Sequence, residues 1–437
     1  MATYNSWAGY PKSTATTEHI RWRSDTLPRQ ETGDATYLPF GNGRSYGDVC
    51  LNKGGVLLDV RQLSRFISFD QNQGFLRCEA GVLLSDILQV IVPHGWFLPV
   101  TPGTQYVTVG GAIANDVHGK NHHQAGTFGC HVRAFELLRS NGKRMLCKPD
   151  LHHDWFAATI GGLGLTGLII WAEIQLVTIP SAYMREEALR VRDLSHFMDL
   201  TNDSDQTHEY TAGWIDCLSP AKHAGKGVYF RANFCDDQRG WTDNHGTQSR
   251  HLPFSPGRFL FNRWSLKRFN SLYAASRDYT VDGKVKHYRP VLYPLDGIQN
   301  WNIAYGKAGF LQYQCVVPMN VGIEAIGELL QHISDAQTGS FLSVLKVFGK
   351  KRSPGLLSFP QHGITLALDF PLHNPHVFAL LDKLDQVVMQ AGGAVYPAKD
   401  ARMSSKAFFS FFPQWPQFEP FIDPEFSSDF LVRVVGK

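Results

Sequence analysis

The sequence GNGRSYGD occupies residues 41–48, and a second glycine-rich stretch, PGTQYVTVGGA, occupies residues 102–112. Glycine has no Cβ, so backbone N–H groups in such loops can approach phosphate oxygens closely and their dipoles favour negative charge. Neither stretch is the single G-x-G-x-x-G turn that leads from a strand into a helix in a Rossmann fold. A further turn, NKGG, follows the first stretch and precedes an apolar strand expected at residues 56–60. The two loops predict a bound dinucleotide whose pyrophosphate lies between them.

Six further motifs follow these loops along the chain. They are NDVHGKNHH (115–123), GTFG (126–129), GGLGLTG (161–167), WNIAYG (301–306), GFLQYQ (309–314) and AKD (398–400). All eight strings, in this order, resemble the flavoproteins of the vanillyl-alcohol oxidase and p-cresol methylhydroxylase type. Within that superfamily they are similar to the branch that oxidises polyprenyl-phosphoryl-β-D-ribose. The resemblance spans nearly the whole chain.

The resemblance implies an α+β fold with two domains, and the 437 residues with 43% apolar side chains are enough for two cores. Residues 1–179 are expected to form a p-cresol-methylhydroxylase-type FAD-binding domain. Residues 180–393 are expected to form an inserted substrate-binding domain, and residues 394–437 a C-terminal segment that returns to the FAD domain. Short strands between glycine turns, with a helix at residues 85–92, fit the first of these.

A ferredoxin-like β-α-β-β-α-β unit is predicted between residues 309 and 397. Its strands are expected at 311–317, 341–348 and 364–370 and from Ala394, and its helices at 322–335 and 375–391. The second helix has Asn374 as its N-cap, Pro375 at its first position and Gly392 just past its end. Strand alternation clusters polar side chains on one face of the sheet and leaves the opposite face to the helices. The polar face suits a hydroxylated or phosphorylated ligand, and an ordinary solvent-exposed sheet face is the alternative.

Oxidation of an alcohol by a flavin requires a base, or its equivalent, to take the hydroxyl proton. The resemblance makes Lys399 the first candidate, although an isolated lysine is usually a solvated surface charge. His118 and Tyr293 are the other catalytic candidates. The three histidines of residues 118–123 also raise a metal site. No metal is expected, because Gly119 breaks helical spacing and no nearby cysteine or carboxylate completes a ligand set.

The resemblance also implies a set of substrate-binding residues. They are Tyr46, Lys120, Trp214, Gln312, Gln314, Lys346, Phe348, Thr365 and Ala367. Lys120 could instead approach the flavin ring or be a salt-bridged surface lysine. Ala367 and Thr365 depart from the family, which has a cysteine and an asparagine at these positions. Both lie on one strand face with Asp369, so together they resize and repolarise the pocket and leave the substrate open.

The cofactor expected from the resemblance is FAD. In part of the superfamily a histidine of the first loop binds the flavin covalently, and Arg44 stands at that position. Arginine cannot form that bond, so the FAD is expected to be noncovalent. The expected cofactor-binding residues are Gly41, Asn42, Gly43, Arg44, Ser45, Tyr46, Gly47, Asp48, Gly103, Thr104, Thr108, Val109, Gly110, Gly111, Asn115, Val117, His118, Gly164, Ile169 and Tyr396.

Composition limits the partners and the compartment. A net charge of +3 among 42 basic and 39 acidic side chains gives no reason to expect nucleic acid. Seven cysteines without paired spacing favour reduced thiols in the cytoplasm, and neither a signal peptide nor a membrane span is predicted. The basic, aromatic residues 258–277 suggest peripheral contact with a membrane, with an amphipathic helix packed on the substrate domain as the alternative.

The function implied by the resemblance is FAD-dependent oxidation of a sugar ring hydroxyl, foremost C2' of polyprenyl-phosphoryl-β-D-ribose. The resulting 2'-keto sugar would be the first half of an epimerisation to arabinose, which a short-chain dehydrogenase/reductase partner completes. An FAD-dependent oxidase of a soluble sugar, polyol, aldonolactone or secondary-metabolite alcohol is the alternative. A flavin-binding protein without catalytic activity is a further one.

Overall fold

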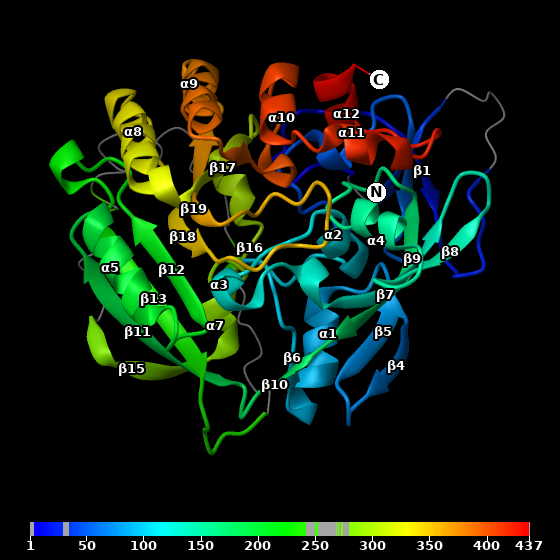
Figure 1. Cartoon of the computed structure of the whole chain (residues 1–437), viewed down its shortest axis with the longest axis horizontal. Helices are drawn as coiled ribbons and strands as arrows, with labels where there is room; N and C mark the ends of the chain where they lie inside the picture. The colour runs from blue at the N-terminus through cyan, green and yellow to red at the C-terminus, as the bar shows by residue number, and fades with distance from the viewer. Residues whose placement is uncertain are drawn as a thin grey trace.

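The computed structural model describes residues 4–28, 35–241, 250–251, 268, 270, 272–273 and 279–436. The chain has an α+β fold of two halves that lie side by side (Figure 1). Its strands follow the α+β pattern predicted from the sequence, and most form three larger sheets. Only one of these sheets combines strands from both sides of residue 300.

The first half contains a three-stranded parallel sheet and a five-stranded antiparallel sheet. The parallel sheet has the order β1 (Thr16–His19), β3 (Val56–Asp59), β2 (Tyr37–Phe40). The antiparallel sheet has the order β4 (Phe66–Asp70), β5 (Phe75–Glu79), β9 (Leu168–Gln175), β7 (Val132–Leu138), β8 (Arg144–Cys147). The accompanying elements are α1 (Leu84–Ile91), α2 (Val109–Ala114), α3 (His122–Ala125), α4 (His153–Thr159) and the strand pair β6 (Trp96–Phe97) and β10 (Val177–Thr178).

The second half is built on one eight-stranded sheet. Its order is β15 (Thr280–His287), β11 (Tyr183–Val191), β13 (Gly227–Phe234), β12 (Tyr210–Ile215), β18 (Ser343–Phe348), β19 (Gly363–Pro371), β17 (Phe310–Pro318), β20 (Ala394–Val395). The other elements are α5 (Leu194–Ser204), α7 (Tyr288–Leu292), α8 (Gly322–Asp335), α9 (Val377–Gln390) and the short pair β14 (Arg250–His251) and β16 (Ile298–Gln299). The predicted β-α-β-β-α-β unit is confirmed, and β18-β19-β17-β20 is the strand order of a ferredoxin-like sheet.

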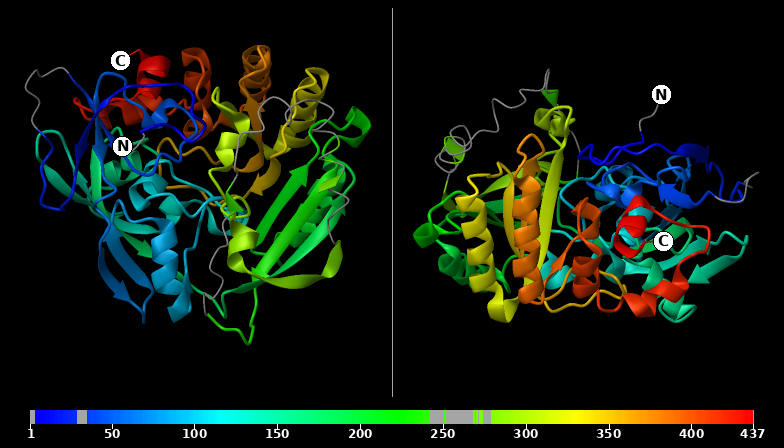
Figure 2. Two further views of the ribbon diagram at one scale, coloured as in Figure 1. Left: turned by 180° about the vertical axis from the view of Figure 1, so that it is seen from behind. Right: turned by 90° about the horizontal axis from the view of Figure 1, so that it is seen from above.

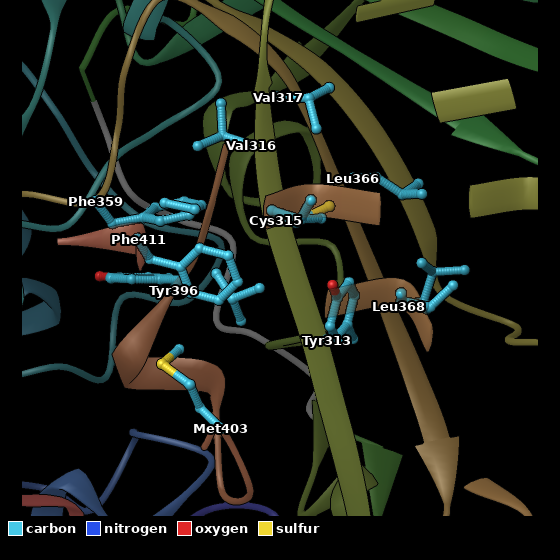
Figure 3. Packing of buried hydrophobic residues seen from close by; sticks show 14 of the residues in the cluster. Tyr313, Cys315, Val316, Val317, Phe359, Leu366, Leu368, Tyr396, Met403 and Phe411 are labelled. Carbon is cyan, nitrogen blue, oxygen red and sulfur yellow. The ribbon is translucent and has the colours of Figure 1, made fainter. Parts of the chain in front are cut away.

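Helices α5, α8 and α9 cover one face of the eight-stranded sheet because both partners are apolar there. On α8, Ile326, Leu329, Leu330 and Ile333 recur at helical spacing and are buried. On β17 and β19, Tyr313 pairs with Leu368 and Cys315 with Leu366, and all four are buried on the helix side (Figure 3). The polar residues that alternate with them therefore face the other way, toward the first half of the chain.

The C-terminal segment packs on the first half. It forms α10 (Ser405–Phe411), α11 (Trp415–Phe418) and α12 (Asp429–Val435), drawn in red beside the blue and cyan segments (Figures 1 and 2). Tyr37 of β2 forms a parallel bridge with Phe426, and Arg433 of α12 binds the carboxylate of Asp48. The domain limits at residues 179 and 393 stay a prediction.

Three details differ from, or fall outside, the sequence-based prediction. Helix α9 begins at Val377 rather than 375, since the Asn374 side chain accepts a hydrogen bond from the N–H of His376 and holds a turn before the helix. The ferredoxin-like strands are only half of their sheet, because β18 continues it through β12. Most of residues 258–277, where membrane contact was predicted, lies outside the described residues.

Candidate cofactor and substrate site

A cavity of about 930 Å³ lies where the two halves meet. The first half contributes both glycine-rich loops and residues 163–164 and 167–169 to its wall. The second half contributes the polar face of the eight-stranded sheet, and the chain then closes the cavity with Tyr396, Ala398 and Lys399. A cavity of this size, formed by convergent polar groups on a largely apolar wall, is typical of a small-molecule or cofactor site.

The two glycine-rich loops contact each other across this cavity. The side-chain amide of Asn42 donates a hydrogen bond to the carbonyl oxygen of Tyr106 at 2.7 Å. A Cβ at Gly41 would lie 2.4 Å from Oγ1 of Thr108, so the approach of the loops requires glycine there. The pair of loops predicted from the sequence therefore forms one continuous surface.

The first loop also positions the turn that carries Lys399. The backbone N–H of Tyr46 donates to the carbonyl oxygen of Ala398 at 2.9 Å. A Cβ on Gly47 would lie 1.6 Å from the carbonyl oxygen of Asp400, so only glycine allows this contact. Two segments more than 350 residues apart in the sequence are thus joined through their backbones at the cavity.

Lys399 is enclosed at the end of this turn, with its Nζ 3.6 Å from the centroid of the Tyr46 ring. Burial is the main cause that lowers the pKa of Lys399 to about 7; the negative charge of Asp369 opposes this shift, and the nearby Lys346 adds to it. Near neutral pH the amine can therefore either hold or accept a proton, as a general base requires.

His118 lies between two residues of the sheet. Its Nε2 is 3.0 Å from the amide nitrogen of Gln314 and its Nδ1 is 3.4 Å from Nζ of Lys346. Burial, with the charges of Lys346, His122 and Lys399, holds the pKa of His118 well below its usual value, so the imidazole is neutral. Because a neutral imidazole has a single N–H, one of its ring nitrogens donates and the other accepts in these two contacts.

Most of the residues predicted from the sequence line the cavity together. These are Gly41, Asn42, Gly43, Arg44, Ser45, Tyr46, Gly103, Thr104, Thr108, Gly110, Gly111, Asn115, Val117, His118, Lys120, Gly164, Ile169, Trp214, Gln312, Gln314, Lys346, Ala367, Tyr396 and Lys399. Lys120 is partly buried, and its Nζ donates to the carbonyl oxygen of Val291.

The remaining predicted residues stand behind this wall. Six of the predicted residues are not among the described residues that line the cavity: Gly47, Asp48, Val109, Tyr293, Phe348 and Thr365. The hydroxyl of Tyr293 is 2.7 Å from that of Thr101, which does line the cavity. Phe348 packs on the ring of His118, and Thr365 accepts a hydrogen bond from Gln314. Their contacts support residues of the wall, so we do not propose Tyr293 as the base.

Several residues of the site were not predicted. The centroid of a Trp7 ring lies 4.0 Å from Cζ of Arg44, and Phe230 and Phe341 line the cavity together with Trp214. Asp369 is buried and binds Gln312. Only Asp369 had a sequence signal, its position on the strand face of Thr365 and Ala367, since the others belong to no motif.

The cavity fits a dinucleotide flavin. Arg44 Nε and Asn115 Oδ1 are buried in residues of its wall without a hydrogen-bond partner among the described residues. Buried polar atoms are normally paired, so a bound group with phosphate and amide functions would complete these two. The described residues contain no cluster of histidine, cysteine or carboxylate side chains that could hold a metal ion, and no helix among them could cross a membrane.

Comparison with known proteins gives the same cofactor. Residues 30–148 match the FAD binding domain family. The chain is 36% identical over 92% of its length to decaprenylphosphoryl-beta-D-ribose oxidase of Mycolicibacterium smegmatis, of which it covers 90%. It is 32% identical over 81% of its length to a Streptomyces coelicolor protein described as an uncharacterized protein in the mprA 5' region, of which it covers 100%. To human Delta(24)-sterol reductase it is 24% identical over 46% of its length, covering 41% of that protein.

Proposed function

This FAD-dependent oxidoreductase belongs to the family of decaprenylphosphoryl-β-D-ribose oxidase, and from that membership we propose that it oxidises the C2' hydroxyl of a polyprenyl-phosphoryl-β-D-ribose to the 2'-keto sugar. The observation that carries the proposal is the cavity wall formed by the eight-stranded sheet. It changes along the sheet from polar and cationic near Lys399 to aromatic near Trp214. A substrate that is a sugar phosphate at one end and a hydrocarbon at the other matches this change.

The polar end of the wall would bind the sugar. Gln312 and Gln314 on β17 and Lys346 on β18 share one face of the sheet, with β19 between the two strands, and Lys399 lies at the end of the cavity. FAD, when bound along the two glycine-rich loops, supplies the two-electron acceptor for the carbon that is oxidised. Lys399 takes the proton of the hydroxyl group on its Nζ, and the phenol of Tyr46, whose pKa burial holds well above its usual value, stays protonated and can donate a hydrogen bond.

The middle of the wall would bind the phosphate. Lys346 and Lys120 both line the cavity, and they are near enough that the charge of Lys120 adds to burial in lowering the pKa of Lys346 to about 7. A phosphate between them would relieve that repulsion and favour the charged amines. Both lysines would then hold the phosphate between the sugar and the chain.

The aromatic end would bind the hydrocarbon. Val344 pairs with Ala367 and with Trp214, so the sugar-binding face continues directly into strands β12 and β13. Trp214 donates its indole N–H to the carbonyl of Phe341, and its ring centroid lies 4.6 Å from that of Tyr273. Phe230 lies beside them in the cavity wall. Because the indole N–H already has a hydrogen-bond acceptor, the rest of the ring presents an apolar surface that a prenyl chain can cover.

Replacing Trp214 with alanine is expected to raise KM for the lipid-linked sugar by about 30-fold, because about 2 kcal/mol of contact with the chain is lost. KM for phosphoryl ribose without a chain should not change. Trp241 is a matched control, since its indole also donates to a backbone carbonyl, that of Ile179, and it is not among the residues that line the cavity. Equal effects of W214A on both substrates would contradict the assignment.

FAD is expected to be held without a covalent bond. Arg44 stacks on Trp7 in the first loop, and a guanidinium offers no nucleophile to the flavin. Acid precipitation of the purified protein should therefore leave the yellow chromophore in the supernatant. A yellow pellet would show a covalent link and overturn this prediction.

An anaerobic absorbance titration tests the function directly. Polyprenyl-phosphoryl ribose should bleach the flavin, whereas free pentoses, polyols and aldonolactones should not. Bleaching only by the soluble compounds would overturn the proposal, and the family departures at Thr365 and Ala367 would then explain the change of substrate. Absence of bleaching by any alcohol would leave a flavin-binding protein without this activity.

The product and the site of action belong to the same proposal. A 2'-keto sugar becomes arabinose only after reduction from the opposite face, so a short-chain dehydrogenase/reductase is the partner that the family resemblance implies. The enzyme would work in the cytoplasm, in peripheral contact with the membrane that carries its lipid-linked substrate.

A further inference from the structure

Asp369, on strand β19, is a buried carboxylate behind the polar end of the cavity wall, hydrogen-bonded to Gln312, which lines the cavity. Its exposed fraction is 1%, and burial raises its pKa to about 6. It lies directly opposite Gln312 on β17, whose amide nitrogen donates to its Oδ1 at 2.5 Å. A buried carboxylate is retained at a cost unless it is paired, so its surroundings indicate what it does.

The second oxygen of Asp369 connects to the aromatic support of Lys399. The hydroxyl of Tyr305 donates to Oδ2 at 3.2 Å, and the Tyr305 ring stacks on Phe310 at 4.1 Å between centroids. Phe310 in turn makes a T-shaped contact with Tyr46, whose face lies under the amine of Lys399. Asp369 is thus fixed on both oxygens in a cluster that ends at Lys399.

The charges that face this cluster come from several elements. Lys399 is influenced by Asp369 of β19 and by Lys346 of β18, and it in turn acts on His118. Asp369 is influenced by Lys399, Gln312 and Tyr305, and both Tyr46 and Tyr305 respond to its charge. Asp369 is the one group named here that favours the charged form of Lys399, whereas burial and Lys346 oppose it.

We propose that Asp369 is a positioning residue that acts through Lys399: its negative charge stabilises the ammonium that forms when Lys399 takes the substrate proton, and its Oδ1 fixes the Gln312 amide toward the sugar. The hydroxyl proton moves to Lys399, which becomes cationic beside a carboxylate that is already anionic. This role rests on the proposed function of Lys399 as the proton acceptor, but not on the identity of the sugar or the lipid.

Asp369→Asn tests the charge, because asparagine keeps the shape and an oxygen that accepts from Gln312. The measurement is competitive acetylation of the FAD-loaded enzyme without substrate, in which peptide mass spectrometry follows the modification of Lys399 against pH. Loss of the carboxylate should move the midpoint of Lys399 labelling down by about one pH unit, since an opposite charge nearby normally raises the pKa of an amine by that amount or more. The exposed Lys406 is the internal reference.

In turnover, the acidic limb of kcat/KM against pH should move down with the labelling midpoint. The alkaline plateau of kcat should fall by up to about tenfold, the factor that corresponds to one pKa unit. Asp369→Glu, which keeps the charge, should retain the wild-type midpoint and stands in if D369N does not hold FAD.

Tyr305→Phe separates charge from structure, because it removes a hydrogen bond to Asp369 and leaves the carboxylate. It should leave the Lys399 midpoint unchanged. The proposal fails if D369N does not shift the midpoint, or if Y305F shifts it equally. A shifted midpoint in an enzyme that no polyprenyl-phosphoryl ribose bleaches would sustain the inference and overturn the proposed substrate.

Discussion

Replacing Lys399 with methionine is expected to lower kcat by about 10²–10⁴-fold, because the variant has no group in place to take the hydroxyl proton. Methionine keeps much of the length and packing of the lysine stem, and none of the contacts between the glycine-rich loops involves the Lys399 amine. FAD content should therefore stay near that of the wild type. Anaerobic stopped-flow bleaching of the flavin at saturating substrate measures the chemical step directly.

The pH dependence gives a second readout of the same variant. Because the proposed base is the neutral amine, wild-type kcat/KM should rise with pH through the pKa of Lys399, about 7, and level off above it. K399M should lose this limb. The exposed Lys406, seven residues away on α10, provides the control, since K406M should retain both the rate and the limb. A K399M enzyme with more than a tenth of the wild-type rate would assign the base elsewhere, with neutral His118 the next candidate.

The site was predictable where residue type and local geometry are linked. The glycine-rich loops can be predicted from the sequence because only glycine permits the close approaches at Gly41 and Gly47. Strand alternation placed Gln312 and Gln314 on one face, and the register confirms that face together with Asp369 and Ala367. Lys399 has no such local signal: its place in the cavity depends on a backbone contact with Tyr46 that no periodicity encodes.

What the sequence did not predict depends on long-range packing. Trp7 reaches the cavity only because its N–H and carbonyl are held by Ser45 and Asn302, far apart along the chain. The continuation of the ferredoxin-like strands into β12 rests on two paired positions, Gly213 with Leu345 and Trp214 with Val344. Such pairings depend on which strand edges of the sheet are left unpaired, and no local sequence pattern encodes them.

The second large effect is expected at Arg433, which connects the C-terminal helix α12 to both cofactor-side segments. Its guanidinium binds both carboxylate oxygens of Asp48 at 2.7 and 2.8 Å and the carboxylate of Asp400 at 2.9 Å. Both carboxylates are buried, so Arg433→Met leaves two charges without their counter-ion. We expect a loss of about 3–5 kcal/mol in the free energy of unfolding. For a cooperative unit of 150–250 residues that corresponds to a fall in Tm of roughly 6–20 °C.

Flavin fluorescence on heating measures this loss, because free FAD fluoresces as the loops separate. Asp48 ends the first glycine-rich loop and Asp400 follows Lys399, so R433M should release FAD at a lower temperature and also lose catalytic rate. A double variant distinguishes the cause: if the loss arises from uncompensated charge, Asp48→Asn added to R433M should recover part of it. If the double variant is less stable by the sum of both single losses, the network contributes packing alone. Recovery would show that the C-terminal segment holds the cofactor loop and the catalytic turn together through one shared cation.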